Sequence, residues 1–309
     1  MDYVVYVDEI SAEGETILAK SSESIPGGKG ANQAYADGRG AVVTIIGSVG
    51  DDESGNKLIE NLNRANVNTD AIAKIAGTST GCAYVSVNQT GNNNIIVVPG
   101  ANSLLSPAMI DQNIRLLDEC SIILLQREIP VDTVCHTIRI AKERGNTVIL
   151  DPAPAVTGLP LEMYGSVDII KPNEHELETL AGIATDTMEN IQLAAKSLLK
   201  TGVKMVVVTV GSRGAVLVNS EASSLYSVED VDVVDTTAAG DSFTAALAYA
   251  LSEGNSIGKA FQIVDTVSSI VVTRKGAQSS IPTYEEIIAA KMQTGLENIY
   301  RVIRNLHLQ

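Results

Sequence analysis

Residues 122–150 read IILLQREIPVDTVCHTIRIAKERGNTVIL. This stretch begins with an apolar run, Ile122 to Leu125, and ends with a second run, Thr147 to Leu150. Between the two runs, Val131 to Arg144 carries apolar residues at the three- and four-residue spacing of a helix. A strand, a helix and a strand in this order predict a right-handed unit with two parallel strands.

The same alternation extends along the chain in both directions. Val42 to Ile46 precedes a predicted helix from Gly55 to Ala65, and a predicted helix from Ile191 to Thr201 precedes Val206 to Val210. Continuous apolar strands are typical of a parallel sheet that helices cover on both faces. The sequence therefore predicts an α/β fold with a mostly parallel sheet flanked by helices. Tyr284 to Leu308 is also predicted to be helical.

Two segments break this alternation. Tyr3 to Val7 with Thr16 to Ala19, and Gly81 to Val87 with Ile95 to Val98, each form two strand-like runs joined by turn residues. We expect a small antiparallel sheet from residues 1–25 and 78–100, placed as a lid on a core of residues 26–77 and 101–309. A lid of this kind excludes water from an active site. An ordinary sheet edge is the alternative.

Composition excludes several classes of protein. The 309 residues carry a formal charge of -15, with 37 acidic and 22 basic residues, which argues against a nucleic-acid surface. Cys82, Cys120 and Cys135 have unrelated spacings, as expected for reduced thiols. The sequence does not start with the basic residues and apolar run that indicate a signal peptide. Its apolar runs are too short to span a bilayer. We expect a cytoplasmic protein without a membrane partner.

The loop Val234-Asp235-Thr236-Thr237-Ala238-Ala239-Gly240-Asp241 carries the strongest chemical signal. Small residues at the start of a helix leave N–H groups open, and together with the helix dipole these bind an anion such as a phosphate. We predict an anion hole at Ala238, Ala239 and Gly240. Asp241 is the predicted base for the attacking hydroxyl, since phosphoryl transfer needs little else from a protein. A helix cap is the alternative role for Asp241.

A second glycine-rich loop, Pro26-Gly27-Gly28-Lys29-Gly30-Ala31-Asn32-Gln33, opens another predicted helix. It has neither the spacing of a P-loop nor that of a dinucleotide fingerprint. Its approachable backbone, with the side chains of Lys29 and Asn32, is suited to a ligand with several hydroxyl groups. The alternative is a turn before a helix.

Five further motifs accompany the two loops. They are Gly47 to Asp52 (GSVGDD), Asp151 to Pro154 (DPAP), Lys171 to Glu176 (KPNEHE), Thr209 to Gly214 (TVGSRG) and Thr273 to Gln278 (TRKGAQ). In these motifs and in their order, nearly the whole chain resembles the ribokinase family of carbohydrate kinases. The resemblance implies transfer of a phosphoryl group from ATP to O5 of D-ribose, giving ribose 5-phosphate and ADP. A sibling kinase for fructose, deoxyribose or a nucleoside remains an alternative.

The resemblance also assigns residues to the sugar and the transferred phosphate. It makes Asp241 the base for the primary hydroxyl of the sugar, next to the amides of residues 238–240. The residues that it places on the sugar hydroxyls are Asp2, Gly28, Lys29, Asn32 and Glu128.

For the nucleotide and the metals, the resemblance implies three further sets of residues. Asn173 and Glu176 would organise Mg²⁺, partly through water. The nucleotide would contact Asn173, Thr209, Gly211, Ser212, Arg213, Gly214 and Gly240, with Asp265 near the adenine. A potassium-type cation would be held by Asp235 and by backbone oxygens of Thr237, Val271, Arg274, Gly276 and Ser280.

One departure from the family concerns the start of the chain. Family members begin with an apolar strand and Gly-Ser-x-Asn-x-Asp, whereas this sequence starts at the last two of these positions, Met1-Asp2. We therefore expect the first strand of the core to be missing. A catalytically weakened relative that binds sugar or nucleotide is the alternative that follows. The resemblance also implies a homodimer formed through the lid.

Overall fold

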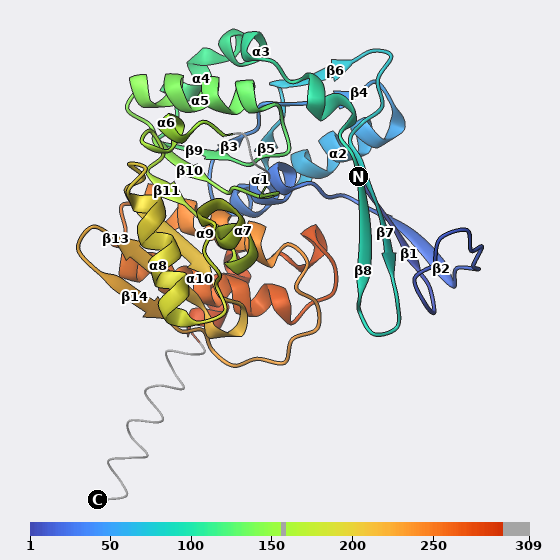
Figure 1. Cartoon of the computed structure of the whole chain (residues 1–309). Helices are drawn as coiled ribbons and strands as arrows, with labels where there is room; N and C mark the ends of the chain where they lie inside the picture. Colours follow the sequence, from blue (N-terminus) through green and yellow to red (C-terminus); the bar gives the residue numbers. More distant parts are fainter. Residues whose placement is uncertain (156–158, 293–309) are drawn as a thin grey trace, which may run out of the picture.

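A six-stranded sheet forms the centre of the computed structural model, which describes residues 1–155 and 159–292 (Figure 1). Its strands, in spatial order, are β14 (Ser223–Tyr226), β13 (Ala215–Asn219), β12 (Met205–Thr209), β11 (Ile169–Ile170), β10 (Thr147–Leu150) and β9 (Ile122–Leu125). Strands β9 to β12 are parallel, and β13 and β14 continue the sheet antiparallel. The predicted, mostly parallel α/β sheet is confirmed.

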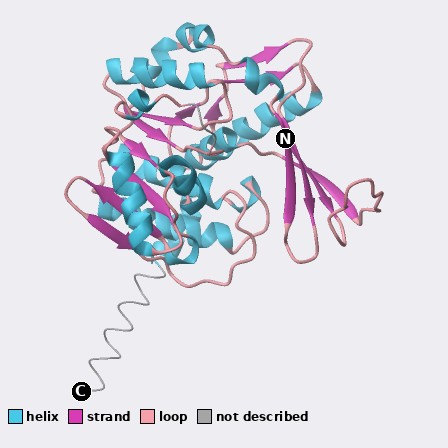
Figure 2. Ribbon diagram, viewed as in Figure 1, coloured by secondary structure: helices cyan, strands magenta, loops and turns pink. Residues whose placement is uncertain are grey.

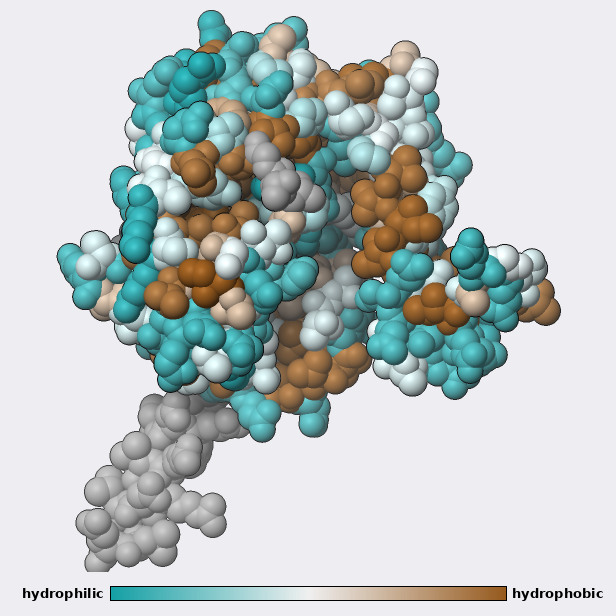
Figure 3. All heavy atoms as spheres, in the orientation of Figure 1, coloured by the Kyte–Doolittle hydropathy of each residue, from teal (hydrophilic) through white to brown (hydrophobic). Residues whose placement is uncertain are grey.

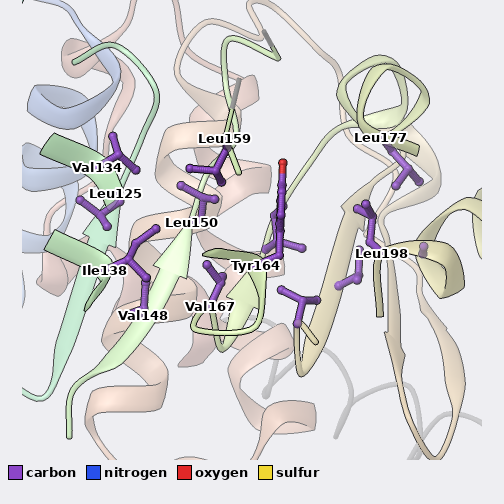
Figure 4. Packing of buried hydrophobic residues seen from close by; sticks show 14 of the residues in the cluster. Leu125, Val134, Ile138, Val148, Leu150, Leu159, Tyr164, Val167, Leu177 and Leu198 are labelled. Carbon is purple, nitrogen blue, oxygen red and sulfur yellow. The ribbon is translucent and has the colours of Figure 1, made fainter. Parts of the chain in front are cut away.

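Alternate side chains of each central strand enter two separate hydrophobic clusters. Val148 and Leu150 of β10 belong to one cluster and Ile149 to the other, and all three are fully buried. Figure 4 shows the first cluster, in which Leu150 lies between Ile138 of α5 (Val131–Glu143) and Tyr164 of α6 (Leu161–Tyr164). Because both faces are covered, these strands need apolar residues at every position, which explains their continuous apolar runs.

Helices cover each face of the central sheet (Figure 2). The first cluster is covered by α3 (Pro107–Gln112), α4 (Ile114–Asp118), α5 (Val131–Glu143), α6 (Leu161–Tyr164), α7 (Glu174–Ala181) and α8 (Met188–Leu199). The second is covered by α9 (Ala239–Ser252) and α10 (Ile257–Val272), and α1 (Lys29–Gly38) packs on α9. Short 3₁₀ turns are η1 (Gly100–Leu104), η2 (Gly211–Arg213) and η3 (Gln278–Ser280).

Two small parallel pairs lie beyond the central sheet. β3 (Val43–Thr44) pairs with β5 (Val67–Asn68), and β4 (Gly47–Gly50) pairs with β6 (Ile72–Ile75), with α2 (Glu53–Arg64) between β4 and β5 in sequence. In the described residues no strand joins these pairs to β9, which ends the six-stranded sheet. The expected missing core strand stays a prediction.

A second, four-stranded sheet projects from this body, and we name it the outer sheet (Figure 1). Its order is β2 (Ser21–Ile25), β1 (Asp2–Tyr6), β7 (Cys82–Val87) and β8 (Asn93–Val98). The two expected hairpin regions do meet here, but β1 and β7 pair in parallel, so the sheet is mixed and not antiparallel. The pairs β1–β2 and β7–β8 are each antiparallel. They meet through their first strands, β1 and β7, and these two strands run in the same direction.

The predicted strand at Thr16 to Ala19 is wrong. Residues 21–25 pair with β1 instead, although four of them are exposed and polar, and Leu18 is 91% exposed. An edge strand of this kind is held by its backbone hydrogen bonds, so its side chains need not be apolar.

Towards the C-terminus, residues 284–292 are helical, and the remainder of the helix expected up to Leu308 lies outside the described residues. Among the described helices, none has the length and apolar character to cross a membrane.

Candidate active site

The carboxyl ends of the four parallel strands all open onto one edge of the central sheet. Glu128 follows β9, Asp151 follows β10, Lys171 and Asn173 follow β11, and Thr209 ends β12. Ligands of open α/β sheets bind at this edge. The polar motifs of the sequence therefore meet at the edge where a site is expected.

Asp241 lies in the first turn of α9 and is 6% exposed. Its Oδ2 accepts a hydrogen bond of 2.8 Å from Asn32 Nδ2, and its Oδ1 accepts one of 3.3 Å from Gln33 Nε2. The cap residue of α9 is Ala238, so Asp241 does not cap the helix and instead joins it to α1. Burial raises the pKa of the Asp241 carboxyl, while Lys29 and Asn32 oppose this effect.

Ala238 adopts a left-handed conformation, with φ 61°, and turns the chain into α9. The N–H groups of Ala238 and Gly240 have no hydrogen-bond partner among the described residues, as an anion hole requires. The N–H of Ala239, in contrast, donates to Thr236 O at 3.1 Å. Of the three predicted donors, two are therefore open in this arrangement of the loop.

A buried ion pair supports the loop from below. Lys171 Nζ lies 2.9 Å from Asp151 Oδ2 and donates to Gly240 O at 3.3 Å, and both side chains of the pair are at most 5% exposed. Asp151 Oδ2 also accepts hydrogen bonds from Gln33 Nε2 at 3.1 Å and from Thr244 Oγ1 at 3.3 Å. This network fixes the start of α9 to β10, β11 and α1.

The sequence assigned no role to Gln33, Asp151, Lys171 or Thr244, although the first three stand in its motifs. A signal was present at Asn32 and Gln33, because two adjacent amides in an alanine-rich helix are either exposed or paired. In the structure both are buried, and Gln33 Oε1 also accepts a bond of 2.6 Å from Gln126 Nε2.

The predicted sugar residues gather around the first turn of α1. Glu128 Oε2 accepts a hydrogen bond of 2.9 Å from the backbone N–H of Lys29, and Gly28 before it has φ 98°. Asp2 lies so close to Gly27 that a Cβ at this glycine would be 2.0 Å from Asp2 Oδ2. The structure therefore brings four parts of the chain together. They are the glycine-rich loop that contains Gly27 and Gly28, the loop before α9, β1 and the end of β9.

Charges at this place influence one another. Burial opposes the charge of Lys29, but the carboxylates of Asp241, Asp151 and Glu128 raise its pKa. Burial raises the pKa of Glu128 and of Asp2, and the charge of Asp241 contributes to both shifts. One cation among several acids is suited to a neutral ligand whose hydroxyl groups both donate and accept hydrogen bonds. Figure 3 shows the surface hollowed between the outer sheet and the body.

Most of the predicted nucleotide residues lie at the ends of β11 and β12, which an isolated bridge between Asn173 and Thr209 holds side by side. Gly211 and Gly214 enclose the turn η2, with φ 58° and 97°, where other residues would be strained. Within this turn, Arg213 forms an ion pair with Glu174. Asp265 lies in α10, and its Oδ1 accepts a bond from Glu229 N at 3.2 Å.

The residues predicted for metals are only partly assembled. Asn173 and Glu176 form a capping box at the start of α7, and no group of three or more acidic, histidine or cysteine ligands occurs in the described residues. One carboxylate fits Mg²⁺ only when the phosphates of a nucleotide and water complete its six oxygens.

For the monovalent cation, Asp235 Oδ1 accepts from Thr237 N at 2.9 Å and its Oδ2 accepts from Gly276 N at 2.9 Å. These bonds join the loop before α9 to the segment after α10. Val271 lies in the last turn of α10, Ser280 lies in η3, and the side chain of Arg274 pairs with Glu286.

An open helix N-terminus with a buried carboxylate, at the carboxyl edge of a parallel sheet and beside a cluster of polar groups, is the site of a phosphotransferase that acts on a hydroxyl group. The pfkB family of carbohydrate kinases matches residues 1–284. The chain belongs to this family of carbohydrate kinases.

Individual relatives agree with the family. A deoxyribokinase of Salmonella typhi is 36% identical over 93% of this chain and 94% of its own length. A ribokinase of Bacillus subtilis is 37% identical over 93% of this chain and 94% of its own. The structure of Arabidopsis thaliana ribokinase complexed with ribose and ATP superposes with a TM-score of 0.88 at 36% identity, covering 94% of this chain and 95% of that one. The chain is therefore a phosphotransferase with a ribokinase-like fold.

Proposed function

We propose that this kinase transfers the γ-phosphoryl group of ATP to O5 of D-ribose, producing ribose 5-phosphate and ADP. The observation that carries the proposal is the bond between Asn32, in the loop expected to hold the sugar, and Asp241, at the open start of α9. The bond supports the proposal because it joins the carboxylate at the two open amides to the loop expected to bind hydroxyl groups. The printed ligands of the Arabidopsis thaliana structure, ribose and ATP, support the same pair of substrates.

In the proposed reaction, Asp241 takes the proton of the sugar hydroxyl while the oxygen of this hydroxyl attacks the γ-phosphorus. The bond from this phosphorus to the bridging oxygen breaks, and ADP leaves with the electron pair. The N–H groups of Ala238 and Gly240 stabilise the charge on the transferred group. Lys171 holds the carbonyl of Gly240, so these donors keep their direction during the transfer.

Mg²⁺ at Asn173 and Glu176 would neutralise charge on the phosphates, and K⁺ near Asp235 would stabilise the loop before α9. Support comes from the capping box, which holds Asn173 and Glu176 together at the start of α7, and from the bonds of Asp235 to Thr237 and Gly276. Burial opposes the charge of Asp235, but these bonds lower its pKa, so it is a carboxylate at neutral pH.

The second candidate substrate is 2-deoxy-D-ribose, because the Salmonella typhi relative is a deoxyribokinase. The test is ADP release with ribose, 2-deoxyribose and fructose at equal concentrations. We expect kcat/KM for ribose to exceed that for 2-deoxyribose roughly tenfold, as for one lost hydroxyl contact. Equal or reversed values contradict the choice of ribose. The same assay without Mg²⁺, or with Na⁺ for K⁺, tests the metals, and turnover should fall in both cases.

A homodimer through the outer sheet is a further part of the proposal. In β8, the side chains of Ile95, Ile96 and Val97 are 53%, 60% and 64% exposed. Figure 3 shows apolar side chains gathered over strands β7 and β8. A contiguous apolar patch of this kind is typical of an interface. The outer sheet is also the expected lid, so in such a dimer the paired outer sheets would cover the sugar sites of both subunits.

A further inference from the structure

A cavity of about 310 Å³ lies between α1, α9, α10 and residues 281–291, and we name it the α1–α9 cavity. Its wall on α9 begins at Ser242, the residue after Asp241. Its volume lies at the lower end of the range found for small-molecule sites. None of the residues to which the sequence or the proposed reaction assigns a role lines it.

Two buried polar atoms in the wall of this cavity lack partners. Asp37 Oδ1 and Ser242 Oγ have no hydrogen bond among the described residues, and the two side chains are 8% and 0% exposed. A buried polar group without a partner destabilises the folded state, because it has lost its hydrogen bonds to water. Native structures contain few such groups, and those that exist call for an explanation. A ligand with a hydroxyl group at this end of the cavity would supply the missing partner to both.

Three cationic side chains line the same cavity, together with a single exposed acid. The cations belong to Arg39, Lys259 and Lys291, and the acid is Glu253. Burial raises the pKa of Asp37 well above its ordinary value, which disfavours the charged form that would balance these cations. On a chain with a net charge of -15, such an excess of positive charge indicates an anionic ligand.

The rest of the wall is apolar and aromatic. Ala246, Ile263 and Val267 are buried beside the cavity, and the rings of Tyr249 and Tyr284 meet edge to face with centroids 6.3 Å apart. Apolar and aromatic walls with a few polar groups are typical of a site for a small organic molecule. The body of the ligand is therefore expected to be a ring and not a flexible polyol.

We propose that the α1–α9 cavity binds a small aromatic carboxylate with a hydroxyl group opposite the acid. The carboxylate lies among the cationic side chains, and the hydroxyl reaches Asp37 and Ser242. The two helices that form the cavity also carry the active site, since Ser242 follows Asp241 and Asp37 is one turn beyond Gln33.

The probe is 4-hydroxybenzoate, titrated calorimetrically into the full chain without sugar or ATP. Benzoate lacks the hydroxyl and 4-hydroxybenzyl alcohol lacks the charge, so each removes one of the two anchors. We expect 4-hydroxybenzoate to bind at least roughly tenfold more tightly than either compound. Equal binding of the three, or no heat up to about 10 mM, overturns the proposal. Because neither substrate is present, this result does not depend on the kinase reaction.

Two variants locate the binding. Lys259→Gln removes one cation at the surface and should weaken 4-hydroxybenzoate roughly fivefold or more, while Lys200→Gln, an exposed lysine after α8, should not. Asp37→Leu should remove the preference for 4-hydroxybenzoate over benzoate. If Asp37→Leu does not fold, the lysine pair still decides, since equal weakening or none in both variants places the binding elsewhere.

Discussion

At the level of single residues, Asp241 is the side chain on which the proposed reaction depends most. Asp241→Asn keeps an oxygen for Asn32 Nδ2 but loses the base. We expect kcat to fall by about two or more powers of ten, with calorimetric binding of ribose and ATP nearly unchanged. The exposed residue Asp70 provides the matched control, Asp70→Asn, which should retain full turnover. Turnover within about threefold of the parent rejects Asp241 as the base.

The pH dependence of turnover follows from the same carboxyl. Burial is the main cause that raises the pKa of Asp241, and the base must be deprotonated to act. Turnover should therefore fall as the pH drops through this raised pKa, at a higher pH than for an ordinary aspartate. A profile of kcat/KM measures the acid limb, which Asp241→Asn should lack.

Lys171 is a positioning residue in this account. Lys171→Met leaves Asp151 buried without its cation, which costs about 3–5 kcal/mol in the free energy of unfolding. Adding Asp151→Asn should restore most of this stability in urea unfolding, because no buried charge remains. We still expect kcat to stay roughly tenfold or more below the parent, with KM for the sugar little changed, because Gly240 O has lost its charged donor and keeps only Thr244 Oγ1.

Recovery of turnover together with stability in this double variant shows that Lys171 is needed only for folding. The comparison separates the two roles because stability and kcat are measured on the same two variants.

Residues of the candidate site were predictable to different degrees. Asn32 and Asp241 stand in short motifs whose chemistry a sequence displays, and the structure joins them by a hydrogen bond. Lys171 gives no such signal, since a lysine in a loop is exposed in most proteins. Its burial depends on β10, α1 and α9 coming together, which no local pattern of residues encodes.

Among the elements, α2 connects the outer sheet to the body. Its cap, Asp52, accepts bonds from Gly55 N at 2.8 Å and from Thr80 N, just before β7, at 2.7 Å. Asp52→Ala should lower the free energy of unfolding by about 1–2 kcal/mol in urea, whereas Asp70→Ala should change it little.

The effect of Asp52→Ala should depend on pH. Burial opposes the charge of the Asp52 carboxylate, but the bonds from Thr80 and Gly55 lower the pKa of Asp52. Because the pKa of Asp52 is lower in the folded protein, its carboxylate contributes stability at pH values above the ordinary pKa of an aspartate. This stability is lost as the pH falls through the lowered pKa of the folded protein. The difference between variant and parent should shrink on acidification. A difference that is constant down to pH values below both pKa values contradicts this explanation.

Whole elements were predicted well where burial imposes a pattern. β9 and β10 begin and end at the predicted residues, because strands buried on both faces are apolar throughout. β2 was misplaced because its polar side chains are exposed, and only its backbone pairing defines it. The parallel pairing of β1 with β7 joins residues about 80 positions apart, so no local pattern could predict it.

Over the whole molecule, apolar side chains are distributed differently in the two sheets. The central sheet buries them between helices, whereas every residue of β8 is exposed. Exposed apolar edge strands favour association, and the commonest soluble oligomer is a symmetric dimer. The outer sheet is therefore where the molecule is expected to meet a second copy.

Ile96→Glu tests this expectation. A charge in an apolar interface is costly to bury, so the variant should be a monomer in sedimentation velocity at concentrations where the parent is a dimer. Leu193→Glu is the matched control, since Leu193 on α8 is 55% exposed and lies far along the chain from the outer sheet. A dimer that survives Ile96→Glu, or dissociates equally in both variants, places the interface elsewhere. If the outer sheet also closes the sugar site, the monomer should show a raised KM for ribose while its unfolding in urea is unchanged.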